Sequence, residues 1–204
     1  MHIKLENLSK NYGITKVLIN LTYTFFSPGL YIIFGPSGSG KTTLLNILGQ
    51  VEKVEEKMVI FEPNRSTNHP SIIFQHHYLI GDLTAYENVV LPLEIKREKF
   101  NKKAIYELFK EYQLAYLMNR KIKDCSGGER QRVNLMRAIS VSSTYLLADE
   151  PTGSVDVETA QFIKQELVKL SQTKLVIIVT HDQNLFADTN AKYLKIERGR
   201  LNEI

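Results

Sequence analysis

The stretch YIIFGPSGSGKTTLLNIL, residues 31–48, decides the fold of this chain. An apolar run leads into a G-x-x-x-x-G-K-[ST] pattern, and an apolar-periodic helix follows it. Glycines here let backbone N–H groups turn inward around phosphate oxygens, and a helix that starts near Gly40 directs its positive end at them. Lys41 adds a charge for the β and γ phosphates of a nucleotide, and the Thr42 hydroxyl can ligate Mg²⁺. The alternative is a Gly/Ser-rich turn before a helix, but a random chain of this length matches the pattern only about 1% of the time, so we predict a nucleotide phosphate site.

Four more short apolar runs lie downstream: MVIF at 58–61, SIIF at 71–74, YLLA at 145–148 and LVIIVT at 175–180. Each is bounded by turn residues and has the length of a buried strand. Because these runs alternate with helical patterns, we predict an α/β fold in which helices pack on the faces of a sheet. No internal repeat, low-complexity tract or linker divides the sequence, so we expect a single domain over residues 1–204.

A mostly helical block lies between SIIF and YLLA. Thr84 followed by Glu87 is a capping-box pattern that opens one helix, and Pro92 should bend or end it. Apolar residues between 104 and 112 recur at helical spacing and give a second helix an apolar face. We therefore place a helical insertion at about residues 76–125. The nucleotide-binding α/β core then comprises residues 1–75 and 126–204.

The composition is that of an ordinary globular protein, since 43% of the 204 residues are hydrophobic and 24% are charged. The longest apolar runs have the length of strands, far short of the roughly 20 residues that cross a bilayer. The N-terminus has no apolar signal core and the single Cys125 can form no internal disulfide, so we expect a cytoplasmic location. The net charge of +4 comes with acidic residues mixed among basic ones, so no nucleic-acid partner is expected.

Three further segments carry polar groups: CSGGERQR at 125–132, YLLADEP at 145–151 and a His after LVIIVT. Ser126 with Glu129 is by itself only a capping box, and the glycines between them could be a turn. With the helix N-terminus they also make a second anion cradle. In YLLADEP, small and apolar residues lead into two carboxylates, which favours a buried strand that ends in a polar site over a solvated loop. Taken alone, His181 would be a surface residue at a strand end.

In this order and spacing the motifs resemble those of the ATP-binding cassette (ABC) ATPase family, and the resemblance covers nearly the whole chain. It implies a P-loop NTPase core with an antiparallel β subdomain and an inserted helical subdomain. It also implies ATP and Mg²⁺ as cofactors, and ATP hydrolysis by two copies of the chain that close around two nucleotides. The interval from Lys41 to Gln75 is shorter than is usual for the family and lacks the usual Pro and Gly, so we infer a trimmed β subdomain.

The resemblance implies roles for single residues. Asp149 would hold Mg²⁺ through water, Glu150 would polarise the attacking water, and His181 would contact the γ-phosphate. Gln75 would reach Mg²⁺ and the water, the SGGE segment would close over the γ-phosphate bound by the other copy, and Tyr12 would stack on adenine. The predicted site residues are Lys41, Gln75, Glu150 and His181 for catalysis; Thr42, Gln75 and Asp149 for the metal; and Tyr12, Gly35, Pro36, Ser37, Gly38, Ser39, Gly40, Lys41, Thr42, Thr43, Ser126, Gly127, Gly128, Glu129 and Asp156 for the nucleotide.

The single Cys125 and the adjacent His76 and His77 are further candidates for a site. Cys125 stands where the family usually has Leu, and a thiol at a helix start can be acidified, but a small apolar filler is the simpler interpretation. His76 and His77 are adjacent and have no further spaced ligands, so we assign no transition metal.

Two segments narrow the subclass, because ADEPTGSVD at 148–156 and LTAYENVVLPL at 83–93 resemble those of the macrolide-exporter and lipoprotein-release group of ABC ATPases. That resemblance implies a separate transmembrane permease subunit, a second copy of the chain as an ATP-dependent partner, and a peripheral position on the cytoplasmic face of the membrane. The candidate docking surface for the permease is Tyr78, Leu79, Ile80 and Leu83, and the alternative is that these residues are ordinary core of the helical insertion.

Two other functions fit the same motifs. A soluble ABC protein that remodels DNA or ribosomes usually has long insertions or two cassettes, for which 204 residues leave little room. A nucleotide-sensing module without turnover would not need both Glu150 and His181. We therefore expect the ATPase subunit of an exporter of antimicrobial peptides, drugs or lipoproteins.

Overall fold

Two β-sheets organise the chain in the computed structural model, which describes residues 1–62, 70–153 and 155–204. Within these residues a three-stranded antiparallel sheet has the order β2-β1-β4, and a six-stranded sheet has the order β5-β6-β7-β3-β8-β9. The strands are β1 (His2–Tyr12), β2 (Thr15–Phe26), β3 (Gly29–Phe34), β4 (Val59–Glu62), β5 (Pro70–Ile73), β6 (Tyr145–Asp149), β7 (Leu175–Val179), β8 (Lys192–Glu197) and β9 (Arg200–Glu203).

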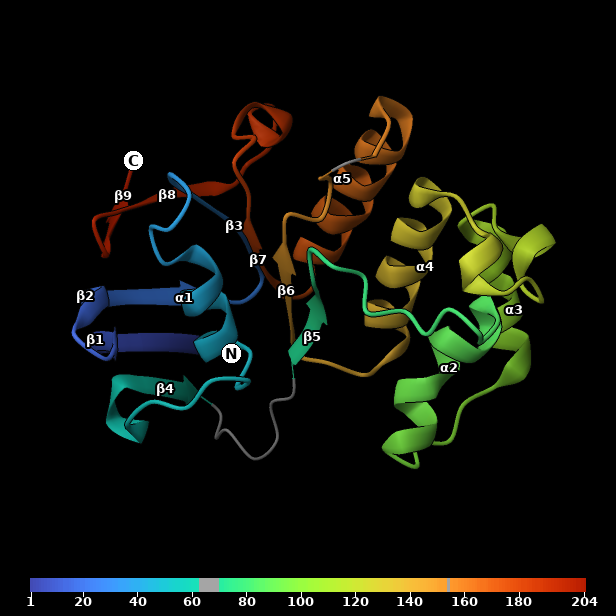
Figure 1. Ribbon diagram of the computed structural model, residues 1–204, viewed down its shortest axis with the longest axis horizontal. Helices are drawn as coiled ribbons and strands as arrows, with labels where there is room; N and C mark the ends of the chain where they lie inside the picture. Colours follow the sequence, from blue (N-terminus) through green and yellow to red (C-terminus); the bar gives the residue numbers. More distant parts are fainter. Residues whose placement is uncertain (63–69, 154) are drawn as a thin grey trace.

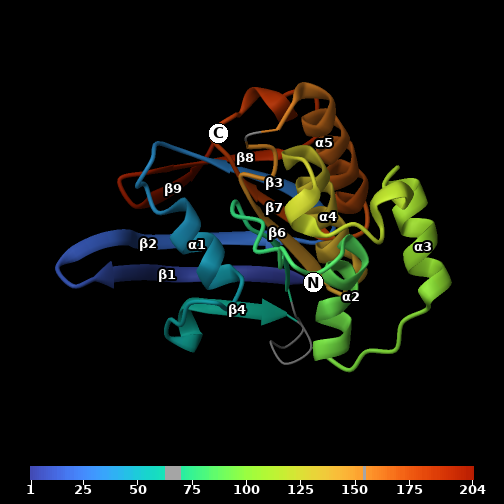
Figure 2. The ribbon, with the colours of Figure 1, turned by 45° about the vertical axis from the view of Figure 1, so that its right-hand side comes forward.

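Helices lie on both sides of the six-stranded sheet. Figure 1 shows α1 beside the small sheet, α4 and α5 across the large sheet from it, and α2 and α3 at the end of the molecule opposite β1 and β2, an arrangement that Figure 2 repeats from a second direction. No helix in the described ranges combines the length and the apolar composition that a membrane span needs. The α-helices are α1 (Lys41–Leu48), α2 (Ala85–Ile95), α3 (Lys102–Glu111), α4 (Gly127–Ser140) and α5 (Val157–Ser171), and the short 3₁₀ helices are η1 (Glu56–Met58), η3 (Ala115–Leu117), η4 (Ile122–Asp124) and η5 (Asn184–Phe186).

The six-stranded sheet is buried on both faces, which explains why its central strands are continuous apolar runs. The neighbours Ile32 and Ile33 of β3 are both fully buried, yet they enter different hydrophobic clusters. Ile33 shares its cluster with Leu44 of α1 and Leu18 of β2, whereas Ile32 shares its cluster with Val133 of α4. The sheet is therefore a middle layer between α1 with the small sheet on one side and the remaining helices on the other.

Four of the five expected strands lie in the six-stranded sheet, and MVIF does not. Residues 59–61 of this run lie in β4, which pairs antiparallel with β1 and places Val59 opposite Leu5. The long strands β1 and β2 complete the small sheet, but register shifts between Leu5 and Asn11 interrupt the alternation that would have marked them in the sequence. The apolar run of a buried strand does not show which sheet it joins.

The expected capping box opens α2. Thr84 Oγ1 accepts a hydrogen bond from the Glu87 backbone N–H at 3.2 Å, and Glu87 Oε2 accepts one from the Thr84 N–H at 2.7 Å. The helix continues past Pro92 to Ile95, so the expectation that Pro92 could end it is wrong. The Pro92 carbonyl still accepts a hydrogen bond from the Lys96 N–H at 3.1 Å and Leu93 is buried, and these interactions hold the last turn.

Helix α4 contacts both parts of the chain that we separate at residue 126. Val133 belongs to the same buried cluster as Val89 of α2 and Leu146 of β6. Ser140 Oγ also donates a hydrogen bond to the Val89 carbonyl at 3.0 Å. The boundaries at 76 and 126 therefore remain a prediction, because α4 packs against both the helical insertion and the α/β core.

The parallel strands β5, β6, β7 and β3 are consecutive neighbours, so their carboxyl ends meet at one edge of the sheet. The segments that follow them carry Gln75, the pair Asp149 and Glu150, His181, and the loop of residues 35–40. Open α/β sheets bind ligands at this edge.

Candidate functional site

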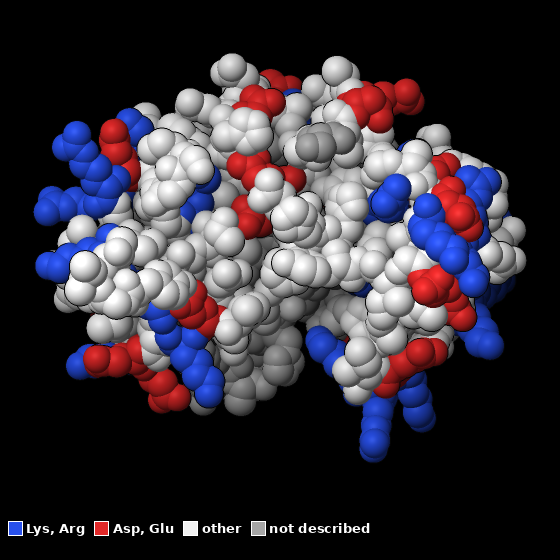
Figure 3. Space-filling view, viewed as in Figure 1, with Lys and Arg blue, Asp and Glu red and all other residues white. Residues whose placement is uncertain are grey.

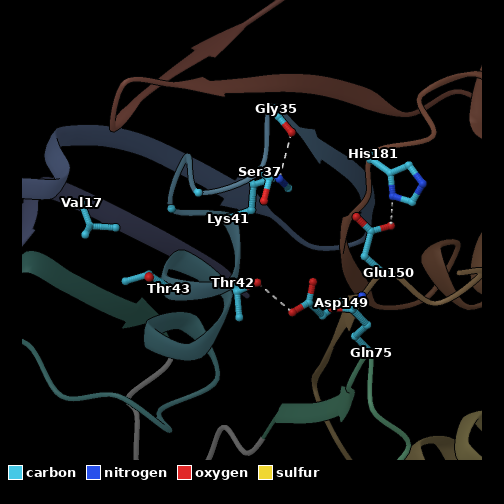
Figure 4. A pocket seen from close by; sticks show the side chains of 12 residues that line it. Val17, Gly35, Ser37, Lys41, Thr42, Thr43, Gln75, Asp149, Glu150 and His181 are labelled. Atoms are coloured by element: carbon cyan, nitrogen blue, oxygen red, sulfur yellow. Dashed lines mark hydrogen bonds and ion pairs between the residues drawn. The ribbon is translucent and has the colours of Figure 1, made fainter.

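A cavity of about 390 Å³ lies at this carboxyl edge (Figure 4). In Figure 4 the loop before α1 runs through the middle of the site, with Val17 of β2 on one side and Glu150 and His181 on the other. Segments from five strands and α1 therefore meet around one space. The lining residues are Val17, Gly35, Ser37, Gly38, Gly40, Lys41, Thr42, Thr43, Gln75, Asp149, Glu150 and His181.

Two glycines give the loop its shape. A Cβ on Gly35 would lie 2.1 Å from the Ile196 carbonyl oxygen, so no larger residue fits there. Gly40 has a φ of 102°, and its Cβ would lie 2.7 Å from Leu18 Cδ2. No side chain of the described residues caps α1 at this end, so the first N–H groups of the helix are left for an anion.

Two polar groups of the loop fit a phosphate. The Lys41 ammonium Nζ donates hydrogen bonds to the carbonyl oxygens of Gly35 at 2.8 Å and Pro36 at 3.0 Å, which holds the charge beside the loop. Ser39 is buried, and its Oγ has no hydrogen-bond partner within the described residues. A buried hydroxyl without a partner is costly. An anion in the loop would give these donors an acceptor.

Asp149 is the buried carboxylate of the site. Its Oδ2 accepts a hydrogen bond from Thr42 Oγ1 at 3.0 Å, and the residue is 6% exposed. Burial raises the pKa of the Asp149 carboxyl above its ordinary value, although the hydrogen bond from Thr42 opposes this effect. A hydroxyl and a carboxylate are the oxygen ligands that Mg²⁺ prefers, so this pair fits a Mg²⁺ ion.

Glu150 faces the same cavity as Asp149, although neighbours in a regular strand point to opposite faces. Its φ of 47° is rare for a residue other than glycine, and this turn at the end of β6 brings both carboxylates into the site. Glu150 Oε2 accepts a hydrogen bond from Thr180 Oγ1 at 3.1 Å and lies 2.9 Å from His181 Nδ1. The His181 side chain is 75% exposed, so one side of this pair is open to solvent.

Gln75 links this cavity to the start of α4. It follows β5 and lines both the large cavity and a neighbouring one of about 240 Å³. The smaller cavity is also lined by Gly127 and Gly153. The Gln75 loop therefore lies between the phosphate loop and the SGGE segment.

Ser126 is the N-cap of α4. Its Oγ accepts a hydrogen bond from the Glu129 N–H at 3.2 Å, and Glu129 Oε2 accepts one from the Ser126 N–H at 2.7 Å. The hydroxyl of Tyr116 donates to Glu129 Oε1 at 2.6 Å. Partial burial pushes the pKa of Glu129 upward, but the hydrogen bonds from Tyr116 and Ser126 outweigh it and hold that pKa below its ordinary value. The carboxylate of Glu129 is thus engaged within its own chain.

Gly128 and Asp156 lie next to each other. A Cβ on Gly128 would be 3.3 Å from Asp156 Oδ2 and 3.0 Å from Thr159 Oγ1. Asp156 is the N-cap of α5, where its Oδ1 accepts a hydrogen bond from the Thr159 N–H at 2.8 Å. The two predicted segments therefore form one surface, and none of Ser126, Gly127, Gly128, Glu129 and Asp156 lines the large cavity.

Tyr12 also lies outside the lining. Its ring is half exposed, and its hydroxyl donates to the carboxylate of Glu52 at 2.5–2.6 Å. Lys10 pairs with the same carboxylate at 2.7 Å, and its Nζ lies 5.5 Å from the centre of the Tyr12 ring. The backbone N–H of Glu52 bonds to the Asn46 carbonyl at the end of α1, which connects the ring to the helix of the phosphate loop.

Two polar side chains, the half-buried Arg137 and the buried Asn88, hold the segment of residues 77–80. Arg137 of α4 donates to the carbonyl oxygens of His77 at 2.5 Å and Tyr78 at 2.8 Å. Asn88 of α2 accepts from the Ile80 N–H at 2.8 Å and donates to the Ile80 carbonyl at 3.1 Å. Tyr78 has a φ of 46° and is 68% exposed, so these bonds hold a strained backbone that presents the ring outward.

Cys125 is buried, with Sγ 3.4 Å from the Lys121 carbonyl. Burial raises the pKa of the thiol above its ordinary value, so the helix start does not activate it. The structure supports the interpretation of Cys125 as a small apolar filler.

All lining residues except Val17 were predicted from the sequence. Val17 is one apolar residue in a strand, and nothing in its pattern indicates a site. Thr180, which binds Glu150, was also missed, although its place beside His181 at the end of a strand was a usable signal. Arg137 and Asn88 were missed because their partners are backbone atoms far away in the sequence.

Comparison with known proteins shows which family and which relatives this chain is similar to. The family model described as "ABC transporter" matches residues 18–153. The chain is 34% identical to a sulfate/thiosulfate import ATP-binding protein of Mannheimia succiniciproducens, an alignment that covers 100% of this chain and 61% of that protein. It is 37% identical to a lipoprotein-releasing system ATP-binding protein of Treponema denticola, over 84% of this chain and 83% of that one. The chain thus spans about three fifths of the length of the sulfate/thiosulfate import protein.

Among solved structures, the chain is similar to the ATP-binding cassette MJ0796 in a dimeric post-hydrolysis state bound to ADP and Pi. The identity is 32%, the TM-score is 0.85, and the alignment covers 99% of this chain and 97% of that one.

Proposed function

Because this chain belongs to the ABC transporter ATPase family, we propose that it is the ATP-binding and ATP-hydrolysing subunit of a membrane transporter. The observation that carries the proposal is the convergence of Lys41, Thr42, Asp149 and Glu150 on one cavity at the edge of a parallel sheet. For phosphoryl transfer to water, Lys41 would supply a positive charge for the phosphates, Thr42 and the buried Asp149 would supply oxygen ligands for a metal ion, and Glu150 would supply a base.

Binding of the nucleotide follows from the loop. The N–H groups at the start of α1 would receive the β-phosphate, and Lys41 would exchange its bonds to the Gly35 and Pro36 carbonyls for phosphate oxygens. Thr42, Asp149 and Gln75 would hold Mg²⁺, which when bound neutralises charge on the β and γ phosphates. Tyr12 would stack on the adenine from outside the phosphate cavity.

Hydrolysis requires a base near the γ-phosphate. Glu150 lies beside the cavity with its Oε2 held by Thr180 and His181, so the carboxylate is oriented before a substrate arrives. Glu150 would take a proton from the attacking water, while His181 would keep the carboxylate in place and contact the γ-phosphate. Asp149 lies deeper and is bound to Thr42, which fits a metal ligand better than a base.

A second copy of the chain would complete the site. Ser126, Gly127 and Gly128 lie at the N-terminus of α4 and do not line the large cavity of their own chain, so the anion cradle that they would form is available to another copy. The dimeric state of the related cassette MJ0796 supports an arrangement in which this cradle closes on the nucleotide of a partner copy.

The membrane partner would dock beside the 77–80 segment. An apolar groove of about 370 Å³ is lined by residues that include Phe74, Tyr78, Leu91, Pro92 and Ile95. Ile80, two residues after Tyr78, is also exposed. Of the four candidate docking residues, Leu79 packs partly against the core and Leu83 is half-buried, so Tyr78 and Ile80 carry the exposed apolar surface. A permease segment in this groove would place the chain on the cytoplasmic face of the membrane. We propose no nucleic-acid partner.

Export is the direction we propose, on the likeness of residues 83–93 and 148–156 to the exporter and lipoprotein-release group. The lipoprotein-releasing relative supports it, whereas the sulfate/thiosulfate import relatives are the alternative. The transported molecule would be an antimicrobial peptide, a drug or a lipoprotein. A soluble remodelling ATPase and a sensing module without turnover remain the rival functions.

The test is Glu150→Gln, which keeps the size of the side chain and leaves Asp149 in place. Loss of a general base typically slows hydrolysis by about 10²–10⁴-fold. We expect ATP and Mg²⁺ to bind, hydrolysis to nearly stop, and a dimer closed by ATP to accumulate in light scattering. Lys41→Ala is the control that is expected not to bind nucleotide, and Glu107→Gln, at an exposed acid on α3, is the control for loss of charge. Hydrolysis at the wild-type rate in Glu150→Gln would remove Glu150 from the mechanism.

A further inference from the structure

The net charge of the chain is concentrated in one short segment. Residues 96–103, KREKFNKK, contain five basic residues and one acidic residue, a balance of +4 that equals the formal net charge of the whole chain. The remaining residues therefore carry 21 basic and 21 acidic side chains. We call residues 96–103 the basic segment.

Most charges of the basic segment have no ion-pair partner among the described residues. Arg97, Lys99, Lys102 and Lys103 are exposed and form no ion pair with any residue that the structure describes. Lys96 lies 4.0 Å from Glu98, at the limit of an ion pair. Figure 3 shows Lys and Arg side chains projecting from the lower edge of the part of the molecule formed by α2 and α3. These cations are free to meet an external anionic surface.

Exposed apolar side chains lie next to these cations. Ile95, which ends α2, is 74% exposed, and with Lys96 it lines the apolar groove described above. Tyr78, which lines the same groove, is 68% exposed. The basic segment is thus continuous with the apolar surface proposed for the membrane partner.

From this combination we infer that the basic segment binds the anionic headgroups of the bilayer in which the proposed permease lies, an inference that rests on the proposed function. Several Lys and Arg side chains in a mostly irregular segment suit a diffuse layer of negative charge better than a partner that needs fixed geometry. Each Lys or Arg near an anionic leaflet contributes about a factor of five to binding. An acidic protein surface or a nucleic acid would be attracted by the same charges and must be separated from lipid by the test.

The experiment is sedimentation of the chain with lipid vesicles. We expect binding at low salt to vesicles of phosphatidylglycerol and phosphatidylcholine, no binding to pure phosphatidylcholine, and release at about 1 M salt, where the Debye length is about 3 Å. The triple variant Lys99→Gln, Lys102→Gln and Lys103→Gln should bind roughly a hundredfold more weakly.

A matched control separates position from net charge. The variant Lys4→Gln, Lys57→Gln and Lys195→Gln loses the same three charges at residues that pair with Glu6, Glu55 and Glu197, and it should bind vesicles as the wild type does. An equal loss of binding in this control would overturn the inference, as would a wild type that ignores the anionic vesicles or prefers polyglutamate or single-stranded DNA to them.

ATP hydrolysis is measured on the same preparations. A wild type that hydrolyses ATP but does not bind anionic vesicles would refute the role of the basic segment and leave the proposed function standing. A wild type that binds the vesicles through the basic segment but hydrolyses no ATP would refute the proposed function alone.

Discussion

The hydroxyl of Thr42 and the carboxylate of Asp149 meet at 3.0 Å although the two residues are 107 positions apart in the chain. The contact joins the first turn of α1 to the end of β6. Asp149 is buried, and burial raises the pKa of its carboxyl, so the fold disfavours the charged form relative to a solvent-exposed Asp.

We predict that Asp149→Asn stabilises the nucleotide-free protein and abolishes Mg²⁺-dependent ATP binding. The folded-state pKa is raised, so stability from the protonated form is complete below the unfolded pKa and is lost as pH rises through the folded pKa. Because Asn resembles the protonated form, its advantage in melting temperature should be largest at neutral pH and shrink as pH falls. Thermal denaturation of both proteins across pH measures this, and a lower melting temperature for Asn at neutral pH would refute it.

We predict that Ser126→Ala abolishes ATP hydrolysis, whereas Thr84→Ala, which removes an equivalent helix cap, does not. Ser126 and Thr84 occupy the same position in equivalent capping boxes, so either change to Ala costs about 1 kcal/mol of stability. If Ser126 also binds the γ-phosphate of a partner copy, only Ser126→Ala should lose turnover. Equal ATPase rates in two variants of equal stability would show that Ser126 is only a cap.

The single-tryptophan variant Tyr12→Trp should report nucleotide binding, since the chain contains no other Trp. Stacking on adenine should quench its fluorescence when ATP is added, and triphosphate without a base should not. Glu52→Gln in a chain that keeps Tyr12 should raise KM for ATP with little change in kcat, because Glu52 orients the ring and does not line the phosphate cavity. Fluorescence that ignores ATP in a variant that still hydrolyses it would place the base elsewhere.

We predict that Arg137→Met loosens the 77–80 segment. The guanidinium donates to two carbonyl oxygens of a strained turn, and neither Met nor a Lys substitute can make both bonds in this geometry. Amide hydrogen exchange over residues 77–83 should become faster, whereas exchange over the phosphate loop should not change. Arg200→Met, a change at an exposed residue of β9, is the control. Unchanged exchange in Arg137→Met would mean that Asn88 holds the segment alone.

The sequence was most informative where chemistry and conformation coincide in one short stretch. The phosphate loop, the apolar run before Asp149 and the two capping boxes could be located because each needs particular residues at fixed spacing. The small sheet was harder to define, because register shifts in β1 break its alternation and because MVIF is the same kind of apolar run as the strands of the large sheet. Long-range contacts, such as Arg137 with the Tyr78 carbonyl, leave no pattern, since a backbone oxygen is available at every residue.

Four neighbouring strands, β5, β6, β7 and β3, each end in one component of the site. Side chains alternate between the two faces of a strand, so inserting or deleting a single residue in any of these strands would turn its terminal group away from the other three. A substitution inside one of these strands has to satisfy only the packing around it. An insertion or deletion of one residue in a strand would disrupt the site. Among distant relatives, variation in length should therefore collect in the loops and in the helical insertion, while the intervals between each strand and its terminal polar residue stay constant.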